Sequence, residues 1–166
     1  SAVSMRTSEM RLVPPSGKPL CYDFEGIVLD RVAHDEALVK LAESRGAQYL
    51  VGSRVKSVDG ETVRLRDGSE YTARVVIGAG GHNDPLRKSE WEVESLIIPV
   101  KFVLMSGDFE DALELHFGSM APGGYAWKFP KRGGANIGLG IQTALARGKS
   151  LNEYSDEFIS RYDGKV

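Results

Sequence analysis

The first half of the chain begins with short apolar runs and then shows a helical pattern. Residues 1–29 are predicted to be extended, because apolar runs at 20–24 and 26–29 are broken by glycine and proline. A helix is predicted over residues 31–45. Asp30 can cap its first turn, and Gly46 suits the left-handed conformation that ends many helices. Four apolar residues recur at helical spacing on one face of this helix: Ala37, Leu38, Leu41 and Ala42.

Short strands are predicted after this helix. They cover residues 49–51, 55–58 and 62–66, and the Asp-Gly pairs at 59–60 and 67–68 predict tight turns. The apolar run 75–77 then leads into a glycine-rich turn at residues 78–81. Because this run is apolar without alternation, we expect a central parallel strand that is buried on both faces.

The second half is predicted to be mainly sheet. Alternation places Ile98, Val100, Phe102 and Leu104 on one face of a strand. A weaker strand is predicted at 113–117. Residues 124–129 and 135–142 are predicted to form a hairpin through the turn at 130–134. A C-terminal helix follows over residues 151–162, with an apolar stripe of Leu151, Tyr154, Phe158 and Ile159. The fold class predicted for the whole chain is therefore mixed α/β (α+β).

Composition narrows the possible partners. The chain has 166 residues, 42% of them hydrophobic and 27% charged, which is enough apolar material for a real core. Its 21 Lys and Arg residues are spread along a chain of net charge −2, so nucleic acid is not an expected partner. The apolar run at 96–105 is about half the ~20 residues that a membrane-spanning helix needs.

The single cysteine indicates the compartment. Cys21 cannot form an internal disulfide, which fits a reducing environment, and we expect it to be a small buried hydrophobe. The expected location is therefore cytoplasmic, with peripheral contact to a membrane left open.

A glycine-rich turn and an arginine are the first candidates for ligand binding. In the turn Gly78-x-Gly80-Gly81, small residues would let the backbone approach a nucleotide closely. The alternative is an ordinary exit from a strand, because the full G-x-G-x-x-G spacing is absent. Arg31, at the start of the predicted helix, could donate to a phosphate or ribityl group, or could be a plain surface residue.

An aromatic strand is the second candidate. Alternation places Tyr125, Trp127 and Phe129 on one face, as either a core layer or the wall of an apolar pocket. On the following strand, Gly138 and Gly140 share a face with Asn136. Glycines at alternate positions leave a strip without side chains, which gives room for something flat or long. From pattern alone, core packing and pocket wall both stay open.

Other catalytic arrangements are missing from the sequence. His34, His82 and His116 lack the spacing of metal ligands, so no metal is expected. No nucleophile elbow is present. No acid is an evident proton donor, and the catalytic residue is left unassigned.

These residues together resemble a known family. Arg31, Asp35, Gly46-Ala47, Val55 and the Ile-Gly-Ala-x-Gly turn are similar to the middle of flavoproteins of the p-hydroxybenzoate hydroxylase type. Within that superfamily, the run GYAWKFPK at 124–131 followed by ANIGLG at 135–140 resembles the signature of geranylgeranyl reductases. The chain is accordingly expected to be an internal fragment of a longer protein, since the family's first Gly-x-Gly-x-x-Gly turn and its later Gly-Asp motif are not found here.

The resemblance implies two regions and two sets of site residues. Residues 1–90 would be a partial FAD-binding α/β region. Residues 91–166 would be the antiparallel sheet of the substrate domain with its C-terminal helix. The residues implied to contact FAD are Arg31, Val55, Gly80 and Gly81, with Gly80 standing where relatives usually carry aspartate. Those implied to bind the substrate are Tyr125, Trp127, Phe129, Pro130, Gly138 and Gly140.

The implied activity is reduction of isoprenoid (geranylgeranyl) double bonds in a lipid, chlorophyll or quinone precursor by an FAD-dependent oxidoreductase. The electron donor is unassigned. Alone, this segment is expected to be inactive and to bind FAD weakly or not at all. One alternative is a relative of electron-transfer flavoprotein–quinone oxidoreductases or of monooxygenases. Another is a non-catalytic module that binds a lipid or a partner.

Overall fold

The computed structural model describes residues 2–86 and 98–166, and it divides into two compact units. The first unit comprises residues 1–40 and 96–166, and the second comprises residues 41–95. Within the described residues, no helix has both the length and the apolar character needed to cross a membrane.

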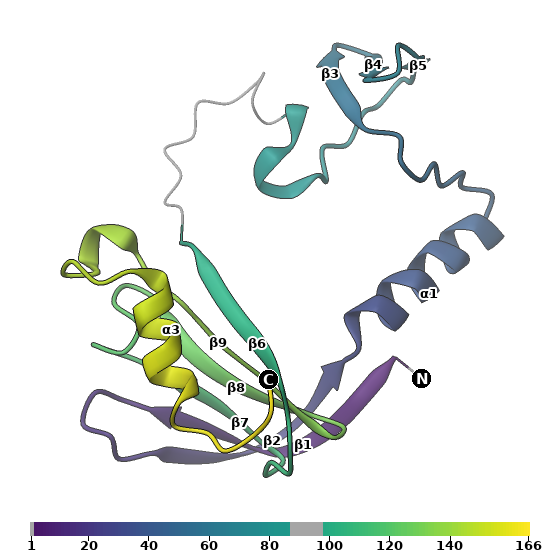
Figure 1. The fold of residues 1–166 in the computed structure, drawn as a ribbon. Coiled ribbons are helices and arrows are strands. Elements are labelled where there is room, and N and C mark those ends of the chain that lie inside the picture. The colour runs from purple at the N-terminus through teal and green to yellow at the C-terminus, as the bar shows by residue number, and fades with distance from the viewer. Residues whose placement is uncertain (1, 87–97) are drawn as a thin grey trace. The chain divides into compact units, whose positions relative to one another are not determined.

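The first unit is built around a six-stranded sheet of order β2-β1-β7-β8-β9-β6 (Figure 1). All neighbouring strands are antiparallel except β1 and β7, which are parallel. The predicted hairpin is confirmed, since β8 and β9 pair from Tyr125↔Gly140 to Lys131↔Gly134. The strands are β1 (Val3–Val13), β2 (Leu20–Leu29), β6 (Val100–Ser106), β7 (Ala112–His116), β8 (Tyr125–Lys131) and β9 (Gly134–Gly140).

The N-terminal hairpin belongs to this sheet, whereas the sequence prediction groups residues 1–90 together. Strand β1 pairs in parallel with β7, from Glu9↔Ala112 to Val13↔His116. Local patterns carry no information on a partner about a hundred residues away, which is why this pairing was not foreseen. The assignment of a flavin region and a substrate region stays a prediction.

Strand β2 forms one edge of the sheet, and this position corrects the expectation for Cys21. The cysteine is exposed rather than buried. An edge strand has a neighbour on one side only, and most of β2 is exposed.

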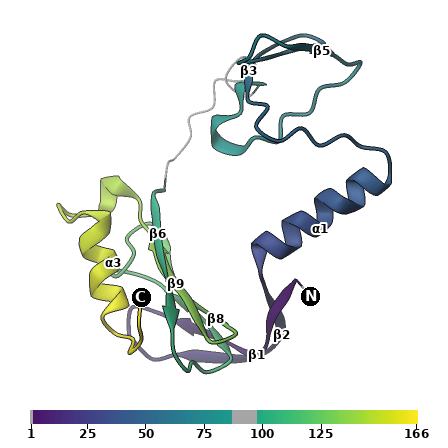
Figure 2. The same cartoon turned by 45° about the vertical axis from the view of Figure 1, so that its right-hand side comes forward.

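Helix α3 (Leu151–Ile159) covers one face of the sheet, as both views show (Figures 1 and 2). Its predicted apolar stripe is confirmed, because Tyr154 and Phe158 are buried. Ser150 and Glu153 form a capping box at its start, which satisfies amide groups that have no partner inside the helix. The helix packs on a core that includes Met105, Ala126, Ala135, Ile137, Leu139 and Ile141.

Helix α1 (Arg31–Ser44) confirms the first helix prediction. The carboxylate of Asp30 accepts a hydrogen bond of 3.1 Å from the amide of Ala33, so it caps the first turn as expected. Gly46 ends the helix with a φ of +94°, in the left-handed region.

The second unit contains a three-stranded antiparallel sheet of β3 (Val55–Asp59), β4 (Thr62–Leu65) and β5 (Glu70–Thr72). Gly60 and Gly68 adopt φ values of +55° and +93°, which confirms both Asp-Gly turns.

Two strand predictions in this unit are wrong. Residues 49–51 form no strand. The expected central strand at 75–77 is also absent, and the side chains of Val75 and Ile77 are 74% and 82% exposed. A strand needs a hydrogen-bonded neighbour, and in the described part of the chain no strand pairs with this segment.

Candidate functional site

The sheet face opposite α3 carries a row of four aromatic rings. Phe117, Tyr125, Trp127 and Phe129 form this aromatic row, with successive ring centroids 6.3, 5.8 and 6.0 Å apart. These distances lie within the range of favourable aromatic pairs. The row follows β8 on the side that α3 leaves uncovered, so it is not part of the core beneath the helix.

Trp127 lies across the glycine strip that the sequence predicts. Its Nε1 donates a 2.8 Å hydrogen bond to the side-chain oxygen of Asn136. A Cβ at Gly138 would lie 2.6 Å from Cζ2 of the indole, so only glycine lets the ring lie this close to β9. The protein's own indole therefore occupies part of the strip that was expected to be empty. At Gly140 a Cβ would meet the side chains of Val100 and Ile98.

Pro130 does not share the face of the aromatic row, which corrects its grouping with the pocket residues. It is fully buried on the opposite face, as are Ala126 and Lys128. The reason is the two-residue period of a strand, which separates position 130 from positions 125, 127 and 129.

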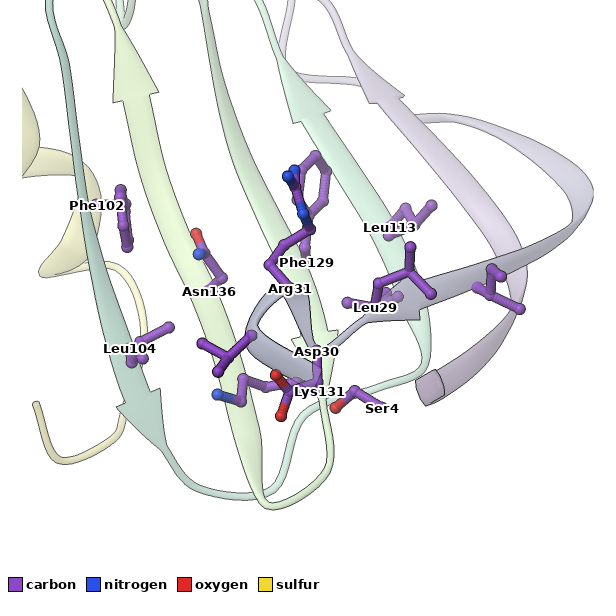
Figure 3. A pocket seen from close by; sticks show the side chains of 13 residues that line it. Ser4, Leu29, Asp30, Arg31, Phe102, Leu104, Leu113, Phe129, Lys131 and Asn136 are labelled. Carbon is purple, nitrogen blue, oxygen red and sulfur yellow. The ribbon is translucent and has the colours of Figure 1, made fainter. Parts of the chain in front are cut away.

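A cavity of about 780 Å³ lies in the first unit, bounded by the sheet, the end of β2 and the start of α1 (Figure 3). Arg31, the predicted flavin contact, and Phe129, a predicted substrate contact, both line it. Its wall is mainly apolar, from residues such as Leu29, Phe102, Leu104 and Leu113. Its polar side chains include those of Ser4, Asp30 and Lys131, which lie at one end in Figure 3.

Arg31 is an exposed cation within this cavity. Its guanidinium lies 3.1 Å from the carboxylate of Asp35, one helical turn later, and this hydrogen bond raises the pKa of Arg31. Asp35 also contacts Nδ1 of His34 at 3.0 Å, and hydrogen bonds from His34 and Arg31 lower its pKa. Arg31 therefore presents a permanent positive charge that an anionic ligand can reach.

The other predicted flavin contacts come together in the second unit. Val55 and Gly80 line one cavity of about 600 Å³ with Val76. The glycine turn beside it is held by Asp84, whose buried carboxylate accepts hydrogen bonds from the amides of Gly80 and Leu86. Gly81 follows with a φ of +70°. Sequence reasoning missed Asp84. The signal was its place three residues after the end of a glycine-rich turn, where aspartate commonly accepts from loop amides.

A polar network lies on the α3 side of the sheet and was also missed. Glu114 contacts Lys128 Nζ at 2.9 Å, His116 Nε2 at 3.1 Å and the hydroxyl of Tyr162 at 3.1 Å. Burial alone would raise the pKa of Glu114, but hydrogen bonds from His116 and Lys128, with the charge of Lys128, lower it to about 2. Burial and the Glu114 charge raise the pKa of Tyr162. None of these four residues lines the cavity. Tyr162 follows α3 in the chain, so its hydrogen bond to Glu114 holds this segment against the sheet.

No group of side chains suited to hold a metal ion is found among the residues for which positions are described. Comparison with known proteins then decides the family. Residues 96–166 match the family model of the geranylgeranyl reductase catalytic domain. This part of the chain belongs to the geranylgeranyl reductase family. The resemblance drawn from the aromatic strand and the glycine strip is thereby confirmed.

A curated relative extends the similarity beyond this domain. The chain is 30% identical over 176 residues to a digeranylgeranylglycerophospholipid reductase of Picrophilus torridus. The match covers 91% of this chain and 44% of the relative, so the chain spans less than half of that protein.

Solved structures confirm the fold class. A geranylgeranyl bacteriochlorophyll reductase-like protein of Thermoplasma acidophilum is similar with a TM-score of 0.77 and 28% identity, over 98% of this chain and 47% of that one. A probable FAD-dependent monooxygenase of Pseudomonas aeruginosa has a TM-score of 0.63 and 18% identity, over 88% and 45% of the two chains. At that identity the second comparison speaks for the fold alone.

Proposed function

We propose that this chain is part of an FAD-dependent reductase that saturates isoprenoid double bonds of a membrane lipid. One observation carries the proposal: Arg31 and Phe129 line the same cavity, on a sheet of which strands β6 to β9 lie in the part that matches the reductase catalytic domain. A site for alkene reduction must bring a flavin and an apolar chain together, and this cavity offers a cation beside an apolar wall. The relative from Picrophilus torridus favours a geranylgeranyl glycerophospholipid as the substrate class.

The described residues fit a flavin nucleotide at two places. Arg31 supplies a permanent positive charge for a phosphate or ribityl group. In the second unit, Val55 and Gly80 line a cavity, and the small residues of the glycine turn leave backbone accessible beside it. The amide of Gly80 is already bonded to Asp84, so contact there would come from neighbouring backbone groups. When bound and reduced, FAD supplies the hydride.

The chain's own residues position the lipid and exclude water. The open face carries Phe102 and Leu104 of β6 and the aromatic row, so apolar side chains lie on both sides of β9. Such a surface aligns an unactivated alkene without bonding to it, so most of the contribution is placement.

The aromatic row can be separated from plain core by one substitution. If Trp127 only packs the fold, Trp127→Ala should cost about 3–5 kcal/mol of unfolding free energy and have no effect specific to a ligand. We expect instead that it also weakens binding of a geranylgeranyl lipid more than that of an aliphatic chain of equal length. Unfolding in urea and lipid titration, made on the same preparations, distinguish the two.

The proposed function is tested by a flavin titration of this chain beside the full-length protein that contains it, followed by FAD absorbance and fluorescence. We expect the full-length protein to bind FAD and then to reduce a geranylgeranyl glycerophospholipid, while the isolated chain binds FAD weakly or not at all. If neither binds, the flavoenzyme assignment fails and a lipid-binding module takes its place. If the full-length protein binds FAD but oxygenates rather than reduces, the monooxygenase alternative is correct.

We also propose a cytoplasmic enzyme that makes peripheral contact with the membrane that holds its substrate. The supporting observation is that the proposed substrate is a lipid, whereas no described helix could carry the chain across a bilayer. Assays with reduced nicotinamides and with ferredoxins would identify the electron donor.

A further inference from the structure

Three loops meet at one end of the six-stranded sheet, and we call this region the loop end. It comprises residues 14–19 between β1 and β2, residues 117–124 between β7 and β8, and residues 141–150 before α3. The amide of Phe117 donates to the carbonyl of Val13 at 3.0 Å, and that of Gln142 to the carbonyl of Pro122 at 2.8 Å. The loops lie together on the left of both ribbon views, away from the turn between β8 and β9 (Figures 1 and 2).

Large apolar side chains project into solvent at the loop end. Leu20, Phe117, Tyr125 and Leu145 are 50%, 40%, 46% and 49% exposed. Single exposed apolar residues are ordinary, but here four lie on three neighbouring loops and the adjoining strand ends. Exposed apolar side chains at the end of this sheet favour an apolar or interfacial partner.

The charges at the loop end are of one sign. The three loops contain Lys18, Arg147 and Lys149 and no acidic residue. The opposite end of the sheet is mixed in charge, because the loop between β6 and β7 contains Asp108, Glu110 and Asp111 while the turn between β8 and β9 contains Arg132. This asymmetry favours a negatively charged surface as the partner of the loop end.

A groove between these loops and α3 combines both properties. It has a volume of about 620 Å³ and is lined by Met120, Leu145, Arg147, Lys149 and Arg161, among others. Lys149 pairs with Glu157 on α3. The wall therefore carries apolar side chains with three basic residues and the acidic Glu157, so Arg147 and Arg161 supply its net positive charge. Such a surface can meet an anionic lipid headgroup above its acyl chains.

Arg147 is held in an unusual backbone conformation. Its φ is +49°, and it is the non-glycine residue with positive φ in the part of the chain that is described. Residues other than glycine are disfavoured in this region of φ. Backbone strain of this kind is found most often at functional sites. A glycine at this position would relieve the strain, whereas arginine adds a positive charge to the groove.

We propose that the loop end docks on the surface of an anionic lipid membrane. This inference rests on the proposal that the substrate is a lipid. Phe117 and Tyr125 begin the aromatic row at the loop end, and Phe129 lies on the wall of the cavity at the other end of the row. A lipid leaving the membrane at the loop end would thus meet a continuous aromatic path to the cavity that Arg31 lines.

Vesicle sedimentation tests the docking surface without FAD or turnover. The chain is mixed with vesicles of phosphatidylcholine alone or of phosphatidylcholine and phosphatidylglycerol in equal parts. We expect binding to the anionic vesicles to exceed binding to the neutral ones by at least tenfold, and to weaken as salt is added. Equal binding to both compositions, or binding to neither, would overturn the proposal.

Two variants and a control locate the surface. Arg147→Gly removes a charge and relieves strain, so it should fold at least as well as the parent while binding anionic vesicles about fivefold more weakly. Leu145→Gln should weaken binding at constant charge. Arg132→Gln, in the turn at the opposite end, removes the same charge and should leave binding unchanged. If Arg132→Gln weakens binding to anionic vesicles as much as Arg147→Gly does, the loss reflects net charge alone and the loop end is not the docking surface.

The outcomes separate this inference from the proposed function. A full-length protein that binds FAD and reduces prenyl lipids, but whose Arg147→Gly and Leu145→Gln variants bind vesicles normally, keeps its function and loses this docking surface. A chain that binds anionic vesicles through the loop end, in a protein that takes no FAD, keeps the docking surface and loses the reductase.

Discussion

Trp127 and Asn136 are joined across β8 and β9 by a hydrogen bond of 2.8 Å from the indole Nε1 to the side-chain oxygen. The bond is diagonal, because the residue directly opposite Trp127 is Gly138. It therefore turns the indole along the sheet and over the glycine instead of letting it stand upright. The surface that a lipid would meet is thus the face of a ring whose orientation is set by an amide on the next strand.

This hydrogen bond should be measurable by a double-mutant cycle. Trp127→Phe and Asn136→Ala each remove one partner, and in the pair the second substitution should cost less than it does alone. A neutral hydrogen bond of this type typically contributes about 1 kcal/mol, so we expect a coupling of that size in urea unfolding. Strictly additive effects would show that the contact contributes nothing to stability.

Substitution at the two glycines of β9 should give unequal losses. In Gly138→Ala the new Cβ would lie 2.6 Å from both the carbonyl oxygen of Lys101 and the indole of Trp127. Backbone cannot yield easily, so we expect a loss of about 2–3 kcal/mol in unfolding free energy. Gly140→Ala serves as the matched comparison, because its Cβ first meets the ends of the Val100 and Ile98 side chains at 2.9 and 3.1 Å. Its loss should be clearly smaller, and a reversed order would contradict this account of the strip.

The Glu114 network should make stability depend on acid pH. The pKa of Glu114 is lowered from 4.5 to about 2, so its contribution is complete above pH 4.5 and is lost as the pH falls from 4.5 towards 2. We expect this contribution to be about 3 kcal/mol, because each pKa unit corresponds to about 1.4 kcal/mol. Glu114→Gln should be less stable at pH 7 because Lys128 then lacks its counter-charge, and its stability should fall less between pH 5 and pH 2.

Urea unfolding at a series of pH values measures this difference. Glu36→Gln provides the control, since it removes an exposed carboxylate of α1 and should follow the parent curve. Parallel curves for the parent and Glu114→Gln below pH 5 would show that the network does not set the acid limit.

The capping box of α3 should make a measurable contribution to the free energy of unfolding. Ser150 Oγ accepts from the amide of Glu153 at 3.2 Å, and the Glu153 carboxylate accepts from the Ser150 amide at 2.8 Å. Ser150→Ala should therefore cost about 1 kcal/mol. Ser160→Ala, at the other end of the same helix, should cost less, and the two variants are compared by thermal unfolding. Equal losses would mean that the cap does not contribute more than any surface serine.

The elements that the sequence predicted well are those set by neighbouring residues. Asp30 and Gly46 delimit α1, and the Asp-Gly turns at 59–60 and 67–68 delimit β4, because caps and turns act over a few residues. The run at 75–77 failed for the opposite reason. Its apolar character fits a buried strand, but a strand exists only with a partner, and partners are not encoded in a local run.

The candidate site was predicted to a similar depth. Alternation along β8 correctly put Tyr125, Trp127 and Phe129 on one face, and the same rule should have excluded Pro130. Asp84 was missed because its role depends on the hydrogen bonds that its carboxylate accepts from the amides of Gly80 and Leu86. The Glu114 network was missed because its members come from β7, β8 and the end of the chain, and only the strand register brings them together.

The parallel pair β1–β7 has a consequence for how this protein forms. Because Glu9 pairs with Ala112, the first two strands must wait for about a hundred further residues before the sheet can close. Such distant pairings slow folding. Until β7 has formed, the edge of β1 in the β1–β2 hairpin is unpaired, and an unpaired strand edge promotes aggregation. In the sequence, residues 41–95 are inserted between the two segments that make up the first unit. Lengthening a closed loop adds only about 0.6 kcal/mol per doubling, so the inserted segment is free to change in size during evolution while the sheet around it keeps its register.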